Sequence, residues 1–87
     1  MPDTSISARI AAISAALVSD YGDDLGDVPH AIWPHTCDLG EAYTAAQALE
    51  VAHDGGLRAL AAGCLLHAQH IAHNARAVMA RQIKEAA

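Results

Sequence analysis

Three histidines in the C-terminal part of the chain, His67, His70 and His73, follow one another at intervals of three residues, and imidazole is a common zinc ligand. On a helix, successive members of this set lie about 60° apart, so the three spread over about a third of the circumference. Helical zinc sites more often place ligands at i and i+4, or at i and i+3 with a carboxylate. His67 and His70 therefore form half a site at most. The residues that would have to complete it from elsewhere are His53, His35 and Cys37. We expect no resident metal and no other cofactor.

Four aspartates crowd the end of the first predicted helix and the segment that follows it, at Asp20, Asp23, Asp24 and Asp27. The DDxxD spacing within it coordinates Mg²⁺ in terpenoid-making enzymes, but those enzymes need a deep helical cavity that a chain of 87 residues cannot enclose. The spacing also differs from that of a calcium-binding loop. Two interpretations stay open. The carboxylates are either a solvated loop or a patch that binds a basic protein surface in place of phosphates.

No motif of a known reaction occurs in the sequence: it has no phosphate-binding loop, nucleophile elbow, HExxH or CxxC. Cys37 lies two residues from His35, which is a weak indication of an activated thiolate. We therefore predict that the protein is not an enzyme.

Composition and periodicity favour an all-α fold, a small three-helix bundle. Hydrophobic residues make up 53% of the chain, yet there is no Phe, and Ala is abundant; alanine favours helices but buries little area. We predict one domain over 1–87, with helices over about 5–21, 38–53 and 57–86 and an Asp- and Pro-rich loop over 22–37.

Local signals set these expected boundaries. Asp3, Thr4 or Ser5 can cap the first helix, whose apolar residues recur at helical spacing. Pro29 and Pro34 are expected to open and close a short turn within the loop. Asp38 and Glu41 have the spacing of a capping box for the second helix. The apolar residues of the first helix are Ile6, Ile10, Ile13 and Leu17.

The long C-terminal helix is expected to be apolar on two sides. Its core face comprises Leu57, Leu60, Ala61, Cys64, Ala68, Ile71, Ala75, Val78 and Met79. Ala59, Ala62, Gly63 and Leu66 lie on the opposite side, and a helix that is apolar on both sides is usually buried on both. We predict a homodimer through this helix. Its expected interface residues are Ala59, Gly63, Leu66 and His70.

The formal net charge of −5 argues against direct nucleic-acid binding, since phosphates attract basic surfaces. No apolar run reaches the length of a membrane span, so no membrane partner is expected. The start of the chain, Met1-Pro2-Asp3, does not resemble a signal peptide. We expect a cytoplasmic protein with reduced cysteines.

These observations predict a non-enzymatic protein-binding module that occupies a partner surface stoichiometrically. The expected contact comprises Asp20, Asp23, Asp24, Asp27 and Trp33. Trp33 either fills a gap beneath the loop or anchors the partner.

In size and charge the chain is similar to inhibitors from phages and mobile elements, such as anti-CRISPR proteins. The alternatives are a His-rich metal-binding or metal-sensing module and a structural or assembly subunit. Because the chain has six histidines and imidazole in general changes its charge just below neutral pH, we also predict that association weakens between about pH 7 and pH 5.5.

Overall fold

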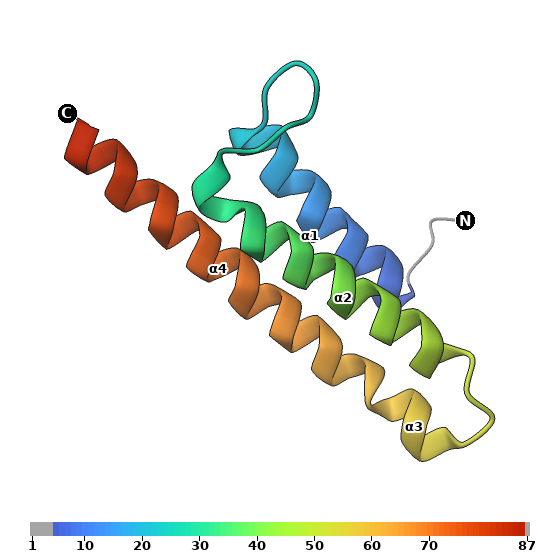
Figure 1. The fold of residues 1–87 in the computed structure, drawn as a ribbon. Coiled ribbons are helices and arrows are strands. Elements are labelled where there is room, and N and C mark those ends of the chain that lie inside the picture. The colour runs from blue at the N-terminus through green and yellow to red at the C-terminus, as the bar shows by residue number, and fades with distance from the viewer. Residues whose placement is uncertain (1–4, 87) are drawn as a thin grey trace.

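The computed structural model describes residues 5–86, and these form an all-helical bundle without a strand. Three helices lie side by side: α1 (Ile6–Tyr21), α2 (Trp33–Glu50) and α4 (Ala61–Ala86). Figure 1 shows α2 running opposite to α1 and α4. The molecule measures 51 × 23 × 18 Å, and its length comes from α4 together with α3 at its N-terminal end. No helix within the described residues is long and apolar enough to cross a membrane.

Helix α1 begins where a cap residue permits it. Ser5 accepts a hydrogen bond from the backbone N–H of Ala8 at 3.1 Å, which satisfies one of the free amides of the first turn. Ile10 and Leu17 are fully buried, while the remaining two isoleucines of the predicted stripe, Ile6 and Ile13, pack against the core at its edge. The other predicted cap residues lie outside the described part of the chain.

Helix α2 begins at Trp33, five residues earlier than predicted, after a 3-10 turn over His30–Ile32 (η1). Pro34 does not close a turn. It stands in the first turn of α2, where a missing N–H costs no hydrogen bond. The predicted capping box is wrong, because Asp38 and Glu41 lie inside α2 with exposed side chains.

The C-terminal half is not one continuous helix. A short helix, α3 (Gly55–Ala59), precedes α4, and Leu60 separates them. Asp54 caps α3 by accepting hydrogen bonds from the N–H groups of Gly56 (2.7 Å) and Leu57 (3.3 Å). The amides of Leu60 and Gly63 bond to carbonyls three residues earlier, at Leu57 and Leu60. This tighter winding changes the direction of the chain before α4 starts.

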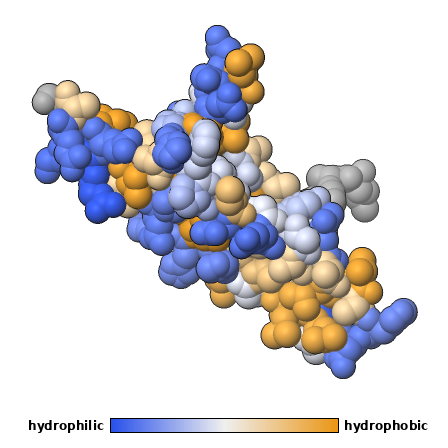
Figure 2. Space-filling view, viewed as in Figure 1, coloured by the Kyte–Doolittle hydropathy of each residue, from blue (hydrophilic) through white to orange (hydrophobic). Residues whose placement is uncertain are grey.

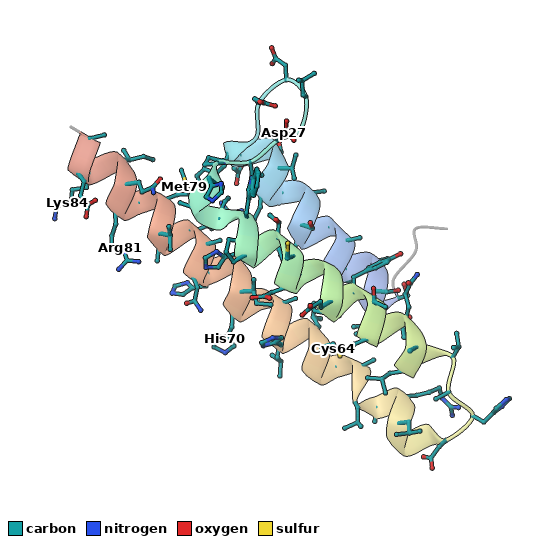
Figure 3. The ribbon with its side chains drawn as sticks, viewed as in Figure 1. Asp27, Cys64, His70, Met79, Arg81 and Lys84 are labelled. Atoms are coloured by element: carbon teal, nitrogen blue, oxygen red, sulfur yellow. The ribbon has the colours of Figure 1, made fainter. Side chains whose placement is uncertain are left out.

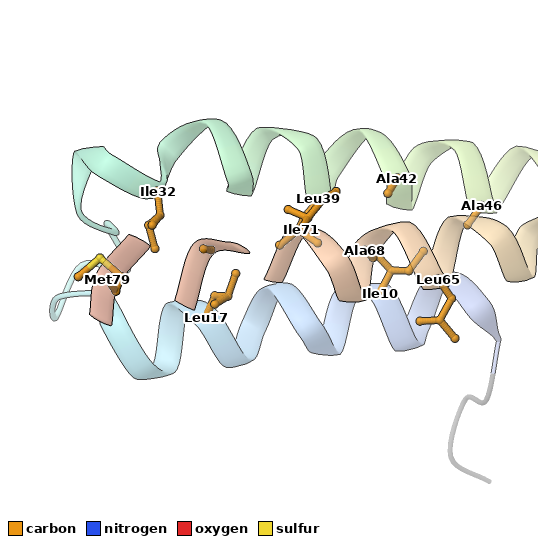
Figure 4. Packing of buried hydrophobic residues seen from close by; sticks show 11 residues of the cluster. Ile10, Leu17, Ile32, Leu39, Ala42, Ala46, Leu65, Ala68, Ile71 and Met79 are labelled. Carbon is orange, nitrogen blue, oxygen red and sulfur yellow. The ribbon is translucent and has the colours of Figure 1, made fainter. Parts of the chain in front are cut away.

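The core lies between the three long helices, as the close-up in Figure 4 shows. Alanines at the contact of α2 with α4, such as Ala46 and Ala68, are fully buried and let the two backbones approach closely. The predicted core positions Leu57 and Leu60 are 46% and 58% exposed, because both precede α4 and the turn of the chain moves them off its core face. Leu65, which was not predicted, is buried instead. The buried apolar residues are Ile10, Leu17, Ile32, Leu39, Ala42, Ala46, Ala61, Leu65, Ala68, Ile71, Ala75 and Met79.

Candidate functional site

The loop between α1 and η1 projects from the side of the bundle as a compact turn (Figures 1 and 2). Asp23 holds it together. Its carboxylate Oδ1 accepts hydrogen bonds from the amides of Leu25 (2.8 Å) and Asp27 (3.0 Å). Its own amide donates to the carbonyl of Asp27 at 2.9 Å. Gly26 adopts a φ of 83°, a conformation that costs glycine little. The loop is therefore braced by its own residues.

The tip of this loop presents an apolar side chain among carboxylates. Leu25 is 87% exposed, more than any other large hydrophobic residue of the described chain. Asp24 and Asp27 flank it and are exposed, whereas the carboxylate of Asp23 is engaged with the loop backbone. The sequence prediction missed Leu25. Its signal was an isolated leucine among aspartates and glycines, where no core position was expected.

Trp33 borders the base of the loop and is half exposed. Its indole Nε1 donates to the backbone carbonyl of Val28 at 2.9 Å, and its ring lies 4.5 Å from that of His30. The neighbouring Ile32 is fully buried and fills the core there. Trp33 instead closes one side of a shallow groove of about 260 Å³ beneath the loop, which Asp27 also lines.

Asp20 differs from the other predicted contact residues because it is paired. Its Oδ2 accepts a hydrogen bond from Nη1 of Arg76 at 2.6 Å, which ties the end of α1 to α4. The bond to Asp20 raises the pKa of the Arg76 guanidinium, which also lies over the ring of Tyr21 at 5.7 Å. Asp20 is thus partly neutralised and contributes less negative charge to the patch than the loop aspartates.

The predicted interface residues of the C-terminal half are all exposed, as a surface available for contact must be. Ala59 lies on α3, and Gly63, Leu66 and His70 lie on α4. Figure 3 shows His70 projecting away from α1 and α2. A Cβ added at Gly63 would meet no atom within 4 Å.

The histidines and cysteines are spread over η1, α2, α4 and the segment between α2 and α3. Within residues 5–86, no three His, Cys, Asp or Glu side chains come close enough to hold a metal ion. His35 and Cys37 both stand on α2 rather than in a loop, and residues two apart on a helix point to different sides. Cys64 is half-buried on α4, where it contacts the edge of the core.

The molecule therefore offers two exposed surfaces of unlike character, an acidic loop with Leu25 at its tip and the outer face of α4. Comparison of the chain with models of known protein families, with curated proteins and with solved structures finds no match.

Proposed function

We propose that the protein is a non-enzymatic binding module that occupies a basic, concave surface of another protein through its acidic loop. The observation that carries this proposal is the loop tip, where Leu25 is 87% exposed between aspartates on a braced backbone. Protein interfaces commonly combine an apolar centre with a polar rim.

The bracing of the loop supports binding without a large loss of conformational entropy. Asp23 holds the turn through two hydrogen bonds to its carboxylate, so the loop has little freedom left to lose when a partner binds. Asp24 and Asp27 remain exposed for a partner's Lys or Arg. Complementary charges of this kind raise the association rate and select the partner.

Trp33 and the groove at its side extend the proposed contact. Half of the indole is exposed next to the loop base, and tryptophan is among the residues most enriched in binding hot spots. A side chain of the partner would enter the groove between Trp33 and Asp27. The proposed mode of action is stoichiometric: the module inhibits its partner by covering a surface that the partner uses for another ligand.

The proposal is tested by affinity capture from the cells that make the protein, followed by titration of the captured partner. Leu25→Ser and the double variant Asp24→Asn with Asp27→Asn should each weaken binding at least about tenfold, because an anchor or two charge pairs are lost. Asp23 is left unchanged because it braces the loop.

A matched control carries the same change of net charge elsewhere. Gln47→Lys with Ala48→Lys, on the exposed side of α2, raises the formal charge by two, as the double aspartate variant does. This control should bind as the parent chain does. Equal binding by the loop variants, with the fold intact by circular dichroism, would rule out the loop as the contact.

A further inference from the structure

The outer face of α4 carries a regular pattern that the core does not use. Six exposed residues recur at alternating intervals of three and four, the spacing of the contact positions in a coiled coil. They are Gly63, Leu66, His70, His73, Ala77 and Ala80. We refer to this set as the α4 seam. It lies opposite the buried face of α4, which comprises Ala61, Leu65, Ala68, Ile71, Ala75 and Met79.

The α4 seam is symmetric about a point between His70 and His73. Gly63 and Ala80 are equally far from that point, and so are Leu66 and Ala77. When two such helices pair in antiparallel orientation about this point, each Leu66 faces an Ala77 and each Gly63 faces an Ala80. Leu66 therefore meets a small side chain in both of its contacts, which permits close packing there. The four central imidazoles of the two copies then meet at the two-fold axis.

Charge complementarity also favours a second copy as the occupant. On one flank of the seam, Asp38 and Glu41 of α2 line a groove of about 570 Å³ together with Gly63 and His67. Arg81 lies two heptads after His67, on the same flank of α4. Among the described residues, Arg81 has no ion-pair partner. Figure 3 shows its side chain projecting away from the bundle.

The antiparallel pairing brings these opposite charges together. In a two-fold antiparallel pair, the same flank of both helices lies on the same side of the dimer. Because the pair is centred between His70 and His73, the Arg81 of one copy lies at about the level of Gly63 in the other. There it meets the groove that Asp38 and Glu41 border. The match occurs twice, once on each side of the axis.

We propose that the protein forms a two-fold homodimer through antiparallel pairing of the α4 seam, with four histidines at its centre and Arg81 of each copy against Asp38 and Glu41 of the other. This surface is separate from the acidic loop, so the dimer does not depend on the proposed partner binding.

The first test is the mass of the full chain in sedimentation equilibrium at about 0.1 to 1 mM, near neutral pH. The expected mass is twice the 9.0 kDa of one chain. Leu66→Glu should return it to the mass of a single chain, because two carboxylates would be buried in the seam without partners. Leu66 is 62% exposed in one copy, so its replacement leaves the fold intact.

Leu25→Glu is the matched control. It introduces the same chemical change at another exposed leucine, on the loop, and should leave the dimer unchanged. The proposal is overturned if the parent chain stays a monomer at about 1 mM, or if both leucine variants remain dimeric.

A second test addresses the orientation. In a chain with Cys37 and Cys64 replaced by Ser, Leu66→Cys and Ala77→Cys variants are mixed under mild oxidation. Antiparallel pairing places position 66 opposite position 77, while the two copies of position 66 lie about 16 Å apart along the axis. We expect disulfide-linked dimers in the mixture and few with Leu66→Cys alone. The reverse result would indicate a parallel pair, and cross-linking in neither sample would contradict pairing through this face.

Discussion

At the scale of single residues, neighbours in the sequence have opposite roles. Ile32 and Trp33 are adjacent, yet Ile32 is fully buried and Trp33 is half exposed. The sequence left two roles open for Trp33, filling a gap beneath the loop or anchoring a partner, and in the structure it is Ile32 of η1 that fills the core. Trp33 instead contributes a hydrogen bond to the carbonyl of Val28, which links α2 to the base of the loop.

Substitutions at these two positions should differ clearly in their cost. Ile32→Ala is expected to lower the free energy of unfolding by about 2 to 5 kcal/mol, because it opens a cavity in the core. Trp33→Ala removes one hydrogen bond and partly exposed contacts, and should cost about 1 to 2 kcal/mol. Urea denaturation followed by circular dichroism measures both. Equal losses would mean that Trp33, as well as Ile32, fills the core.

The ion pair between Arg76 and Asp20 is close, but it contributes little to the free energy of unfolding. The ion pair with Asp20 is short at 2.6 Å, but both side chains are more than 40% exposed. Exposed pairs typically contribute between about 0 and 1 kcal/mol. Since the bond to Asp20 raises the pKa of an already basic group, Arg76 stays protonated through the neutral range, and the stability that this raised pKa represents is present at neutral pH and lost in strong alkali.

At the scale of helices and loops, it was easier to predict that a helix is present than to predict the residues at which it begins and ends. The stripe of Ile10 and Leu17 indicated α1, and the structure has that helix at Ile6–Tyr21. The start of α2 was misplaced because Pro34 was interpreted as a terminator. A proline fits the first turn of a helix equally well, and a connection over 22–37 is longer than the roughly 12 to 15 residues that compact domains usually tolerate.

The break before α4 was hidden by a strong local pattern. Leu57 and Leu60 match the apolar spacing of a continuous helix, so periodicity alone extends α4 backwards. The competing signal was Asp54 followed by two glycines, which caps a separate turn. At the candidate site, the isolated leucine among aspartates and glycines was a signal for an exposed Leu25, but the position of the loop relative to the bundle depends on the tertiary fold and has no local signal.

Two glycines allow a matched test of the loop conformation. Gly26 has a φ of 83°, so Gly26→Ala should lower the free energy of unfolding by about 1 to 2 kcal/mol. Gly40 lies in α2 with open space around its Cβ position, so Gly40→Ala should raise it by up to about 1 kcal/mol. Thermal unfolding of both variants measures the difference. A Gly26→Ala variant as stable as the parent chain would show that the loop does not hold this turn in solution.

At the scale of the whole molecule, polar and apolar surfaces are unevenly distributed. Figure 2 shows apolar side chains gathered at the end of the molecule where α3 and the start of α4 lie. The exposed large residues of that region are Val51, Leu57, Leu60 and Leu66. The acidic loop lies toward the other end of the long axis (Figure 1). The outer face of α4, where His70 projects away from α1 and α2 (Figure 3), lies on the side of the bundle opposite the loop, so a dimer leaves both loops free to bind partners.

A fall in pH tests the centre of the proposed dimer. Imidazole is neutral well above pH 6.5 and charged below it, so acidification places up to four like charges at the meeting point of His70 and His73 from two copies. The other charged or titratable groups near the seam are His67, Arg81 and Lys84 on α4 and the acids of the neighbouring groove on α2; on the α1 side, Arg76 is paired with Asp20.

Two effects oppose each other in this pH range. Protonation of all six histidines would change the formal charge of each copy from −5 to +1, which lowers the general repulsion between copies. The general repulsion between copies acts mostly between charges that are far apart. Salt of about 0.1 M screens it, because the Debye length at that concentration is about 10 Å. The central imidazoles would be in direct contact, where screening is weak, so their repulsion should dominate.

We therefore expect the dissociation constant of the dimer to rise about tenfold or more between about pH 7.5 and pH 5.5. Sedimentation at both pH values measures it. His70→Gln with His73→Gln should form a dimer that does not respond to pH, whereas His30→Gln with His53→Gln, both away from the seam, should respond as the parent chain does. If the parent dimer is as tight at the lower pH, the histidines do not meet at its centre, even if α4 forms the interface.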